Sequence, residues 1–175
     1  MKLVSSMLLA CAVALAGCWH LAVGPAAPRP NVMLAQDKTP AALLLDPGIP
    51  DAFVIPGTGS VNSVPVRGWR GTLEAGFRSA FPPGSPTGRK LELIEAELTF
   101  APAAVGFGGT AAVRATIRFK ARVQDASGKE IGTLAGTVAA REANVSASEA
   151  GMTDNASKAV EALYEALATE LLAKS

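Results

Sequence analysis

The chain has 175 residues, of which 49% are hydrophobic and 5% aromatic, and its 16 basic residues nearly balance its 15 acidic ones. This length is enough for one domain with a substantial core but is short for two. The near-neutral charge argues against a nucleic-acid-binding protein, which needs a strongly basic domain, and gives no overall attraction to an anionic membrane surface.

The first residues have the composition of an export signal. Lys2 is a positive n-region, residues 3–16 form an apolar run, and small residues precede Cys18. The run is about fourteen residues long, whereas a helix needs roughly twenty to cross a bilayer. It therefore indicates a cleaved signal rather than a transmembrane span. The alternative, an ordinary signal peptide followed by an incidental cysteine, leaves the positions of Leu15 and Gly17 unexplained.

Residues 15–18 read Leu-Ala-Gly-Cys and resemble the lipobox of bacterial lipoproteins, so residues 1–17 are predicted to be a lipoprotein signal peptide. The resemblance implies a diacylglyceryl thioether and an N-acyl chain on Cys18, and no other cofactor is expected. Two or more acyl chains anchor a protein stably, whereas one does so only marginally. No disulfide is expected, because Cys11 leaves with the signal and the sulfur of Cys18 carries lipid.

The residue after Cys18 indicates the membrane. It is Trp19 rather than the aspartate that retains lipoproteins at the inner membrane of enteric bacteria. By this analogy we expect the outer membrane, with the domain facing the periplasm or, if it is flipped, the cell surface.

A tether is predicted to follow, over residues 18–40, because Pro25, Pro28 and Pro30 favour an extended chain over a helix. A single domain is then expected over residues 41–175.

Within that domain, short apolar runs at residues 41–45 and 52–55 are bounded by Pro and Gly, which indicates a strand, a turn and a strand. Residues 57–66 are rich in Gly, Ser, Asn and Pro, and predict an exposed loop.

A helix is predicted from residue 67 to about residue 80. Trp69, Leu73, Phe77 and Ala80 recur at intervals of four and three, which forms one apolar face. Each glycine within this stretch costs about 1 kcal/mol relative to alanine. The helix is therefore expected to depend on packing against a sheet.

Strict alternation of apolar and polar residues then predicts two strands, one around residues 94–100 and one over residues 113–124. In the first, Ile94 is expected on the buried side with Ala96, Leu98 and Phe100. After the second, Ser127-Gly128 fits a two-residue hairpin turn. The resulting register pairs Phe119 with Gly136, Ala121 with Leu134, Ile117 with Val138 and Ala115 with Ala140.

Four basic residues lie on the solvent side of the second strand, and they suggest a site for an anionic lipid or lipopolysaccharide. The alternative is a solvated face, partly neutralised by Glu95 and Glu97 of the neighbouring strand. The four candidates are Arg114, Arg118, Lys120 and Arg122. A further candidate contact with a partner or lipid is Phe107, which lies between glycines in a Gly-rich connection, although it could also fold back onto the core.

The final element is a long helix with an apolar stripe at Val160, Leu163, Leu167 and Leu171, with candidate N-caps at residues 153–155. The order of elements predicts an α+β fold: a two-layer sandwich of one mostly antiparallel sheet, with the short and the long C-terminal helix on one face.

Three stretches carry a further resemblance. They are Trp19-His20-Leu21 after the lipobox, residues 44–48, and a C-terminal run that includes Asp154-Asn155, Val160, Tyr164 and Leu171-Leu172. They are similar to small periplasmic lipoproteins of the LptE and YajG-like type. The resemblance implies a lipid-tethered accessory domain that docks on an envelope protein and helps it to assemble or transport.

No enzymatic activity is expected. His20 is the only histidine and lies two residues from the predicted lipid, which disfavours a catalytic triad or a histidine-bearing metal site. The first hypothesis is a non-enzymatic docking subunit of an envelope assembly or transport complex. The alternative is a carrier or sensor that holds a lipid or small apolar ligand between the helices and the sheet.

Overall fold

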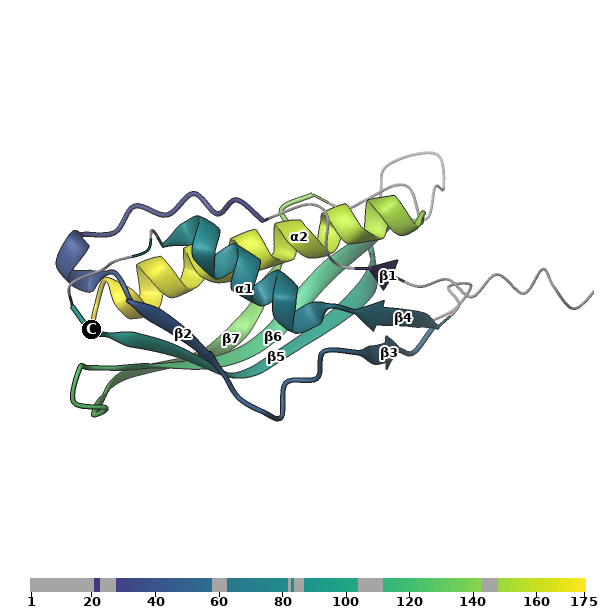
Figure 1. Cartoon of the computed structure of the whole chain (residues 1–175). Helices are drawn as coiled ribbons and strands as arrows, with labels where there is room; N and C mark the ends of the chain where they lie inside the picture. Colours follow the sequence, from purple (N-terminus) through teal and green to yellow (C-terminus); the bar gives the residue numbers. More distant parts are fainter. Residues whose placement is uncertain are drawn as a thin grey trace, which may run out of the picture.

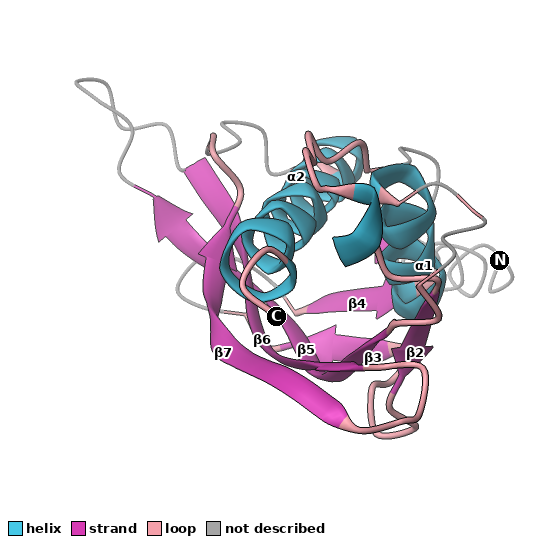
Figure 2. Ribbon diagram, turned by 90° about the vertical axis from the view of Figure 1, so that its left-hand side faces the viewer, coloured by secondary structure: helices cyan, strands magenta, loops and turns pink. Residues whose placement is uncertain are grey.

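The computed structural model describes residues 21–22, 28–57, 63–81, 83, 87–103, 112–142 and 148–175. These residues form an α+β fold in which two helices cover one face of a four-stranded sheet (Figures 1 and 2). The predicted fold class is therefore confirmed.

The main sheet has the strand order β2-β5-β6-β7. Its strands are β2 (Ala42–Leu45), β5 (Lys90–Ala103), β6 (Ala112–Gln124) and β7 (Glu130–Ala139). β5, β6 and β7 form an antiparallel meander, whereas β2 runs parallel to β5. All six apolar residues of the alternating run in β6 are buried, as predicted.

A second, small sheet was not predicted. It has the order β1-β4-β3 and contains β1 (Leu21–Ala22), β3 (Phe53–Ile55) and β4 (Val64–Arg67). Residues 64–66 were predicted to belong to an exposed loop, but Val64 and Val66 are buried. Pro65 lies in the central strand β4 although proline has no N–H to donate to a ladder. It is tolerated there because β1 pairs only with Val66 and Arg67, so no hydrogen bond between β1 and β4 is lost at Pro65.

The helices are α1 (Trp69–Ala80), α2 (Glu149–Ala166) and its continuation η2 (Leu167–Leu172), a π-helical segment. A short 3-10 turn, η1 (Gln36–Lys38), precedes β2. The apolar stripes predicted for both helices are buried, except that Ala80 at the end of α1 is half-buried. The predicted N-cap at residues 153–155 is wrong, because α2 begins at Glu149 and Ser148 caps it by accepting from the Gly151 N–H.

The hairpin between β6 and β7 has the predicted register but not the predicted turn. Phe119 lies opposite Gly136, and Ala121 opposite Leu134. However, Asp125 and Lys129 enclose three residues, and Gly128 adopts a positive φ of 85°. A bulge between Val123 and Gln124 then shifts the register by one residue and restores the predicted pairing.

The Asp125 carboxylate organises this turn. It accepts hydrogen bonds from the Ser127 hydroxyl at 2.6 Å and from the backbone N–H groups of Ser127 and Lys129. The Ser127 hydroxyl is the largest cause that lowers the pKa of Asp125 below its ordinary value. This contribution to stability is therefore present above the unfolded pKa of about 3.9 and is lost as pH falls through the lower folded pKa.

We expect Ser127→Ala to raise the pKa of Asp125 towards its ordinary value, as measured by NMR titration of the carboxyl carbon. Thr133→Ala is the control, because the Thr133 hydroxyl donates to Glu130 instead. An unchanged pKa in Ser127→Ala would contradict this assignment.

The predicted tether is in part packed on the domain. Leu21 is buried in the small sheet, and the backbone N–H groups of Arg29 and Asn31 each donate at 3.1 Å to a glutamate of α2, Glu161 and Glu165 respectively. Two carboxylates one helical turn apart can hold alternate residues of an extended segment. The predicted tether at residues 18–40 is thus packed against α2 at Arg29 and Asn31, while its boundaries at residues 17 and 40 stay predictions.

Candidate binding groove

An open groove lies between β3 with the loop before it and the outer side of β5. Its volume is about 540 Å³, within the roughly 300–1,000 Å³ of small-molecule sites. One wall is formed by residues 48–50 with Phe53 and Val54, and the other by residues 94–97 and Arg118. Val54 is 60% exposed, so the groove presents apolar surface to solvent.

A β-bulge in β5 turns Ile94 into this groove. Leu93 lies opposite Ala121 and Glu95 opposite Lys120, so Ile94 is an extra residue without a partner on β6. Leu93 is buried in the core, whereas Ile94 is half-buried and lines the groove. The prediction that Ile94 faces the core was wrong, because simple alternation cannot anticipate an inserted residue.

The N-terminus of α1 holds the loop at residues 48–50, which forms part of one wall of the groove and is called the loop wall below. Gly68, at the N-cap, has no side chain to offer, and the Asp51 carboxylate accepts from the Arg70 N–H in its place. The Arg70 guanidinium donates to three backbone carbonyls, those of Leu45, Asp46 and Ile49.

Trp69 holds the same wall from the core side. Its indole N–H donates to the Ala96 carbonyl at 2.9 Å, at the edge that β2 leaves open beyond Leu45. Its ring packs edge-on against Phe53 with centroids 6.4 Å apart. The two walls of the groove are thus joined through one buried side chain.

The rim of the groove carries an ion pair. Arg118 donates from Nε at 3.0 Å and from Nη2 at 2.6 Å to the same oxygen of Glu97. The hydrogen bond and the charge of Glu97 raise the pKa of Arg118. Both side chains are more than half exposed, so the pair borders the groove without closing it.

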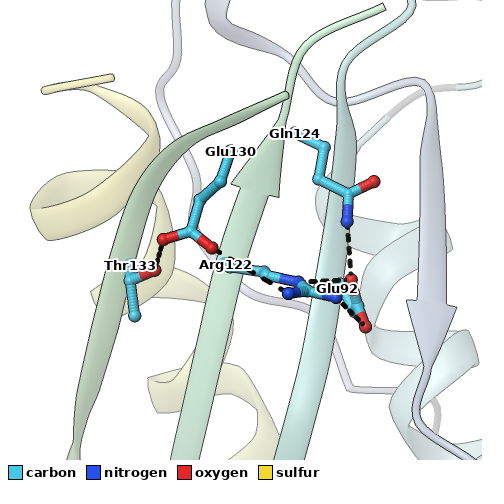
Figure 3. Close-up of polar contacts among 5 residues, drawn as sticks. All are labelled: Glu92, Arg122, Gln124, Glu130 and Thr133. Carbon is cyan, nitrogen blue, oxygen red and sulfur yellow. Dashed lines mark hydrogen bonds and ion pairs between the residues drawn. The ribbon is translucent and has the colours of Figure 1, made fainter. Parts of the chain in front are cut away.

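A second polar cluster joins three strands on the outer face of the sheet (Figure 3). Glu92 accepts from Arg122 at 2.7 and 3.0 Å and from Gln124 at 2.9 Å. Arg122 also lies 3.9 Å from Glu130, which accepts from the Thr133 hydroxyl. Hydrogen bonding to Glu92 is the largest cause that raises the pKa of Arg122.

The four basic residues predicted as an anion-binding face lie together on the outer side of β6. Arg118 and Arg122 are paired with Glu97 and Glu92, and Lys120 lies opposite Glu95. Arg114 lies opposite Ala101 at the other end of the strand. Acidic residues of β5 thus accompany three of the four, while an anion site on this face stays a prediction.

Two other predicted site residues, Phe107 and the lipidation residue Cys18, lie outside the described residues. Within the described part of the chain, no group of three or more His, Cys, Asp or Glu residues could hold a metal ion. Nor does any helix there have the length and apolarity to cross a bilayer.

Sequence reasoning did not find the groove. Its walls come from residues 48–54 and 94–97, which are far apart in sequence and carry no shared motif. Pro50, next to the apolar run at residues 52–55, indicated a turn in the sequence. Nothing in the sequence indicated that this turn lies next to residues 94–97 of β5.

The fold is similar to that of a solved bacterial protein. A structure of a DUF330-family protein from Xanthomonas campestris matches with a TM-score of 0.50 and 16% identity, covering 87% of this chain and 94% of that one. A minor lipoprotein from Acinetobacter baumannii matches with a TM-score of 0.42 and 11% identity, covering 81% of this chain and 95% of that one. No family model and no curated protein matches the sequence.

At this identity the Xanthomonas likeness shows a shared fold alone. It extends over most of both chains, so the arrangement of the sheet and helices is common to the two proteins. The resemblance to the LptE and YajG-like type stays a prediction.

Proposed function

We propose that the protein is a lipid-anchored lipoprotein of the bacterial envelope that acts as a non-enzymatic docking subunit of an assembly or transport complex. The lipobox-like residues 15–18 supply the anchor. Trp19, in place of an aspartate directly after Cys18, supports an outer-membrane location.

The observation that carries the docking role is the difference between the two faces of the main sheet. The inner face is packed against α1 and α2, with fully buried side chains such as Leu93 and Ile117 on the sheet and Leu163 on α2. The outer face carries the groove, with exposed Val54 beside the Glu97–Arg118 pair. Exposed apolar surface with a polar border is typical of a protein contact.

The test is crosslinking in the native cells followed by affinity purification of the membrane-anchored protein. We expect one envelope complex to be recovered, and we expect it to be lost with Cys18→Ala, which removes the anchor. Val54→Glu should also lose it, because a carboxylate would be desolvated in the groove.

Met33→Glu is the matched control, since it also replaces an exposed apolar side chain with a carboxylate, at a residue that is 92% exposed and does not line the groove. Recovery of the complex with Val54→Glu at the level of this control would rule out the groove as the contact.

The volume of the groove also supports a second candidate function, a carrier of a small apolar ligand. The sequence suggested a ligand held between the helices and the sheet, but large buried side chains, including Trp69, Tyr164 and Met152, fill that space. The ligand of a carrier would therefore bind in the groove on the outer side of β5. Co-purification of a lipid that is displaced by Val54→Trp, without any protein partner, would favour the carrier.

A further inference from the structure

Strand β1 places a fixed point of the domain very close to the predicted lipid. Leu21 is 1% exposed and lies opposite Val66 in a parallel ladder. It packs in the same hydrophobic cluster as Trp69 and Val160. Leu21 is only three residues after Cys18, so the chain between the anchor and the folded domain is short.

The length of this connection limits the distance between the domain and the bilayer. Three residues span at most about 10 Å when fully extended. The headgroup layer on each side of a bilayer is about 5–8 Å thick. Leu21 therefore stays within a few ångströms of the headgroup surface, which leaves no room for a layer of protein between the small sheet and the lipid.

We propose that the end of the domain formed by β1, β4 and β3 rests on the phospholipid surface that holds the anchor, so that the domain has one fixed orientation. This rests on the proposed lipidation of Cys18. In Figure 1 the small sheet lies at one end of the molecule, and the β6–β7 hairpin and the C-terminus lie at the other. The hairpin consequently points away from the membrane.

The short connection, rather than charge, sets this orientation. Figure 1 shows β6 and α2 beginning at the end with the small sheet, so charges of both signs are found there: Arg67 in β4 and Arg114 near the start of β6, and Glu149 at the start of α2. Because residues 18–21 tie this end to the lipid whatever the headgroup charge, the orientation does not require an anionic surface. The orientation should therefore be the same on neutral and on anionic bilayers.

Two exposed alanines at opposite ends of the main sheet give a matched test. Ala101 lies near the end of β5, and Ala126 lies in the hairpin turn. Ala101 is eleven positions along β5 from Lys90, which corresponds to about 36 Å at 3.3 Å per residue. Lys90 lies opposite Gln124, two residues before Ala126.

The experiment uses the full-length lipidated protein in vesicles that contain brominated phospholipids, which quench nearby fluorophores. Ala101→Cys and Ala126→Cys are each labelled with a fluorophore at the introduced thiol. We expect several-fold stronger quenching at position 101 than at position 126, on both neutral and anionic vesicles. Equal quenching, or stronger quenching at position 126, would overturn the orientation.

A variant with a flexible Gly-Ser linker of about ten residues inserted after Trp19 tests the cause, because such a linker adds a mean reach of about 17 Å. The quenching at position 101 should then fall towards that at position 126. An unchanged contrast would overturn the argument from the short connection. Protein that fails to sediment with vesicles would refute the lipidation and with it the proposed function, whereas bound protein with equal quenching refutes only the orientation.

Discussion

Gly76→Ala is expected to destabilise the protein by about 1–3 kcal/mol, the usual range for overpacking a core. Gly76 lies where α1 crosses α2. An added Cβ would lie 2.6 Å from Val160 Cγ1 and 2.8 Å from Tyr164 Cε2. Both distances are too short for carbon atoms, so one helix must move or a core side chain must change its rotamer.

Tyr164 cannot yield easily. Its hydroxyl donates to the Leu73 carbonyl at 2.7 Å, and its ring packs edge-on against Phe77 and Phe81. Complete burial is the main reason that the pKa of its phenol is raised. The close contact at Gly76 therefore bears on a side chain that is fixed on several sides.

Gly71→Ala is the matched control within the same helix. A Cβ at Gly71 would meet no atom within 4 Å, so the substitution should stabilise α1 by up to about 1 kcal/mol through helix propensity alone. Urea unfolding of the two variants measures both effects. A Gly76→Ala variant as stable as the unchanged protein, or more stable, would show that the helix crossing does not require a glycine.

Asn155→Ala is the second substitution with a large expected effect. Asn155 is 2% exposed. Its side-chain oxygen accepts from the Ala115 N–H in β6, and its side-chain nitrogen donates to the Glu142 carbonyl beyond β7. Removal of the amide leaves the buried Ala115 N–H without a partner, which costs about 1–3 kcal/mol. The loss of volume adds a further penalty.

Asp154→Ala is the control, because Asp154 is exposed and pairs only with Lys158 on the same helix among the described residues. Its effect on unfolding should stay within about 0.5 kcal/mol. Hydrogen exchange gives a local readout: the Ala115 amide should exchange faster in Asn155→Ala and at the normal rate in Asp154→Ala. Unchanged protection in Asn155→Ala would contradict the role assigned to the amide.

The fold followed from the sequence where a periodic pattern was uninterrupted. The run in β6 and the stripe of α2 are each long enough to reveal their period, and both lie where predicted. The hairpin register was also correct, although a three-residue turn and a compensating bulge replaced the expected two-residue turn. Two opposite one-residue shifts cancelled, which local turn chemistry cannot reveal.

Errors arose where tertiary contacts override local signals. Asn155 is a residue type that often caps helices, but it lies inside α2, where its side-chain oxygen accepts a hydrogen bond from the Ala115 N–H near the start of β6. Gly71 and Gly76 are indistinguishable in the sequence, and only the position of α2 separates an open site from a close contact. The groove could not be predicted because the bulge at Ile94 and the loop at residues 48–50 come together only in the folded chain.

The way in which α1 secures the loop wall of the groove has a consequence for recognition. Asp51 and Arg70 fix this loop through hydrogen bonds made within the domain itself. An incoming molecule therefore meets a preorganised surface, and avoids an ordering penalty of about 0.5–1.5 kcal/mol for each side chain that it would otherwise immobilise. Changes to this wall should consequently alter the residence time of the bound molecule more than the rate at which it associates.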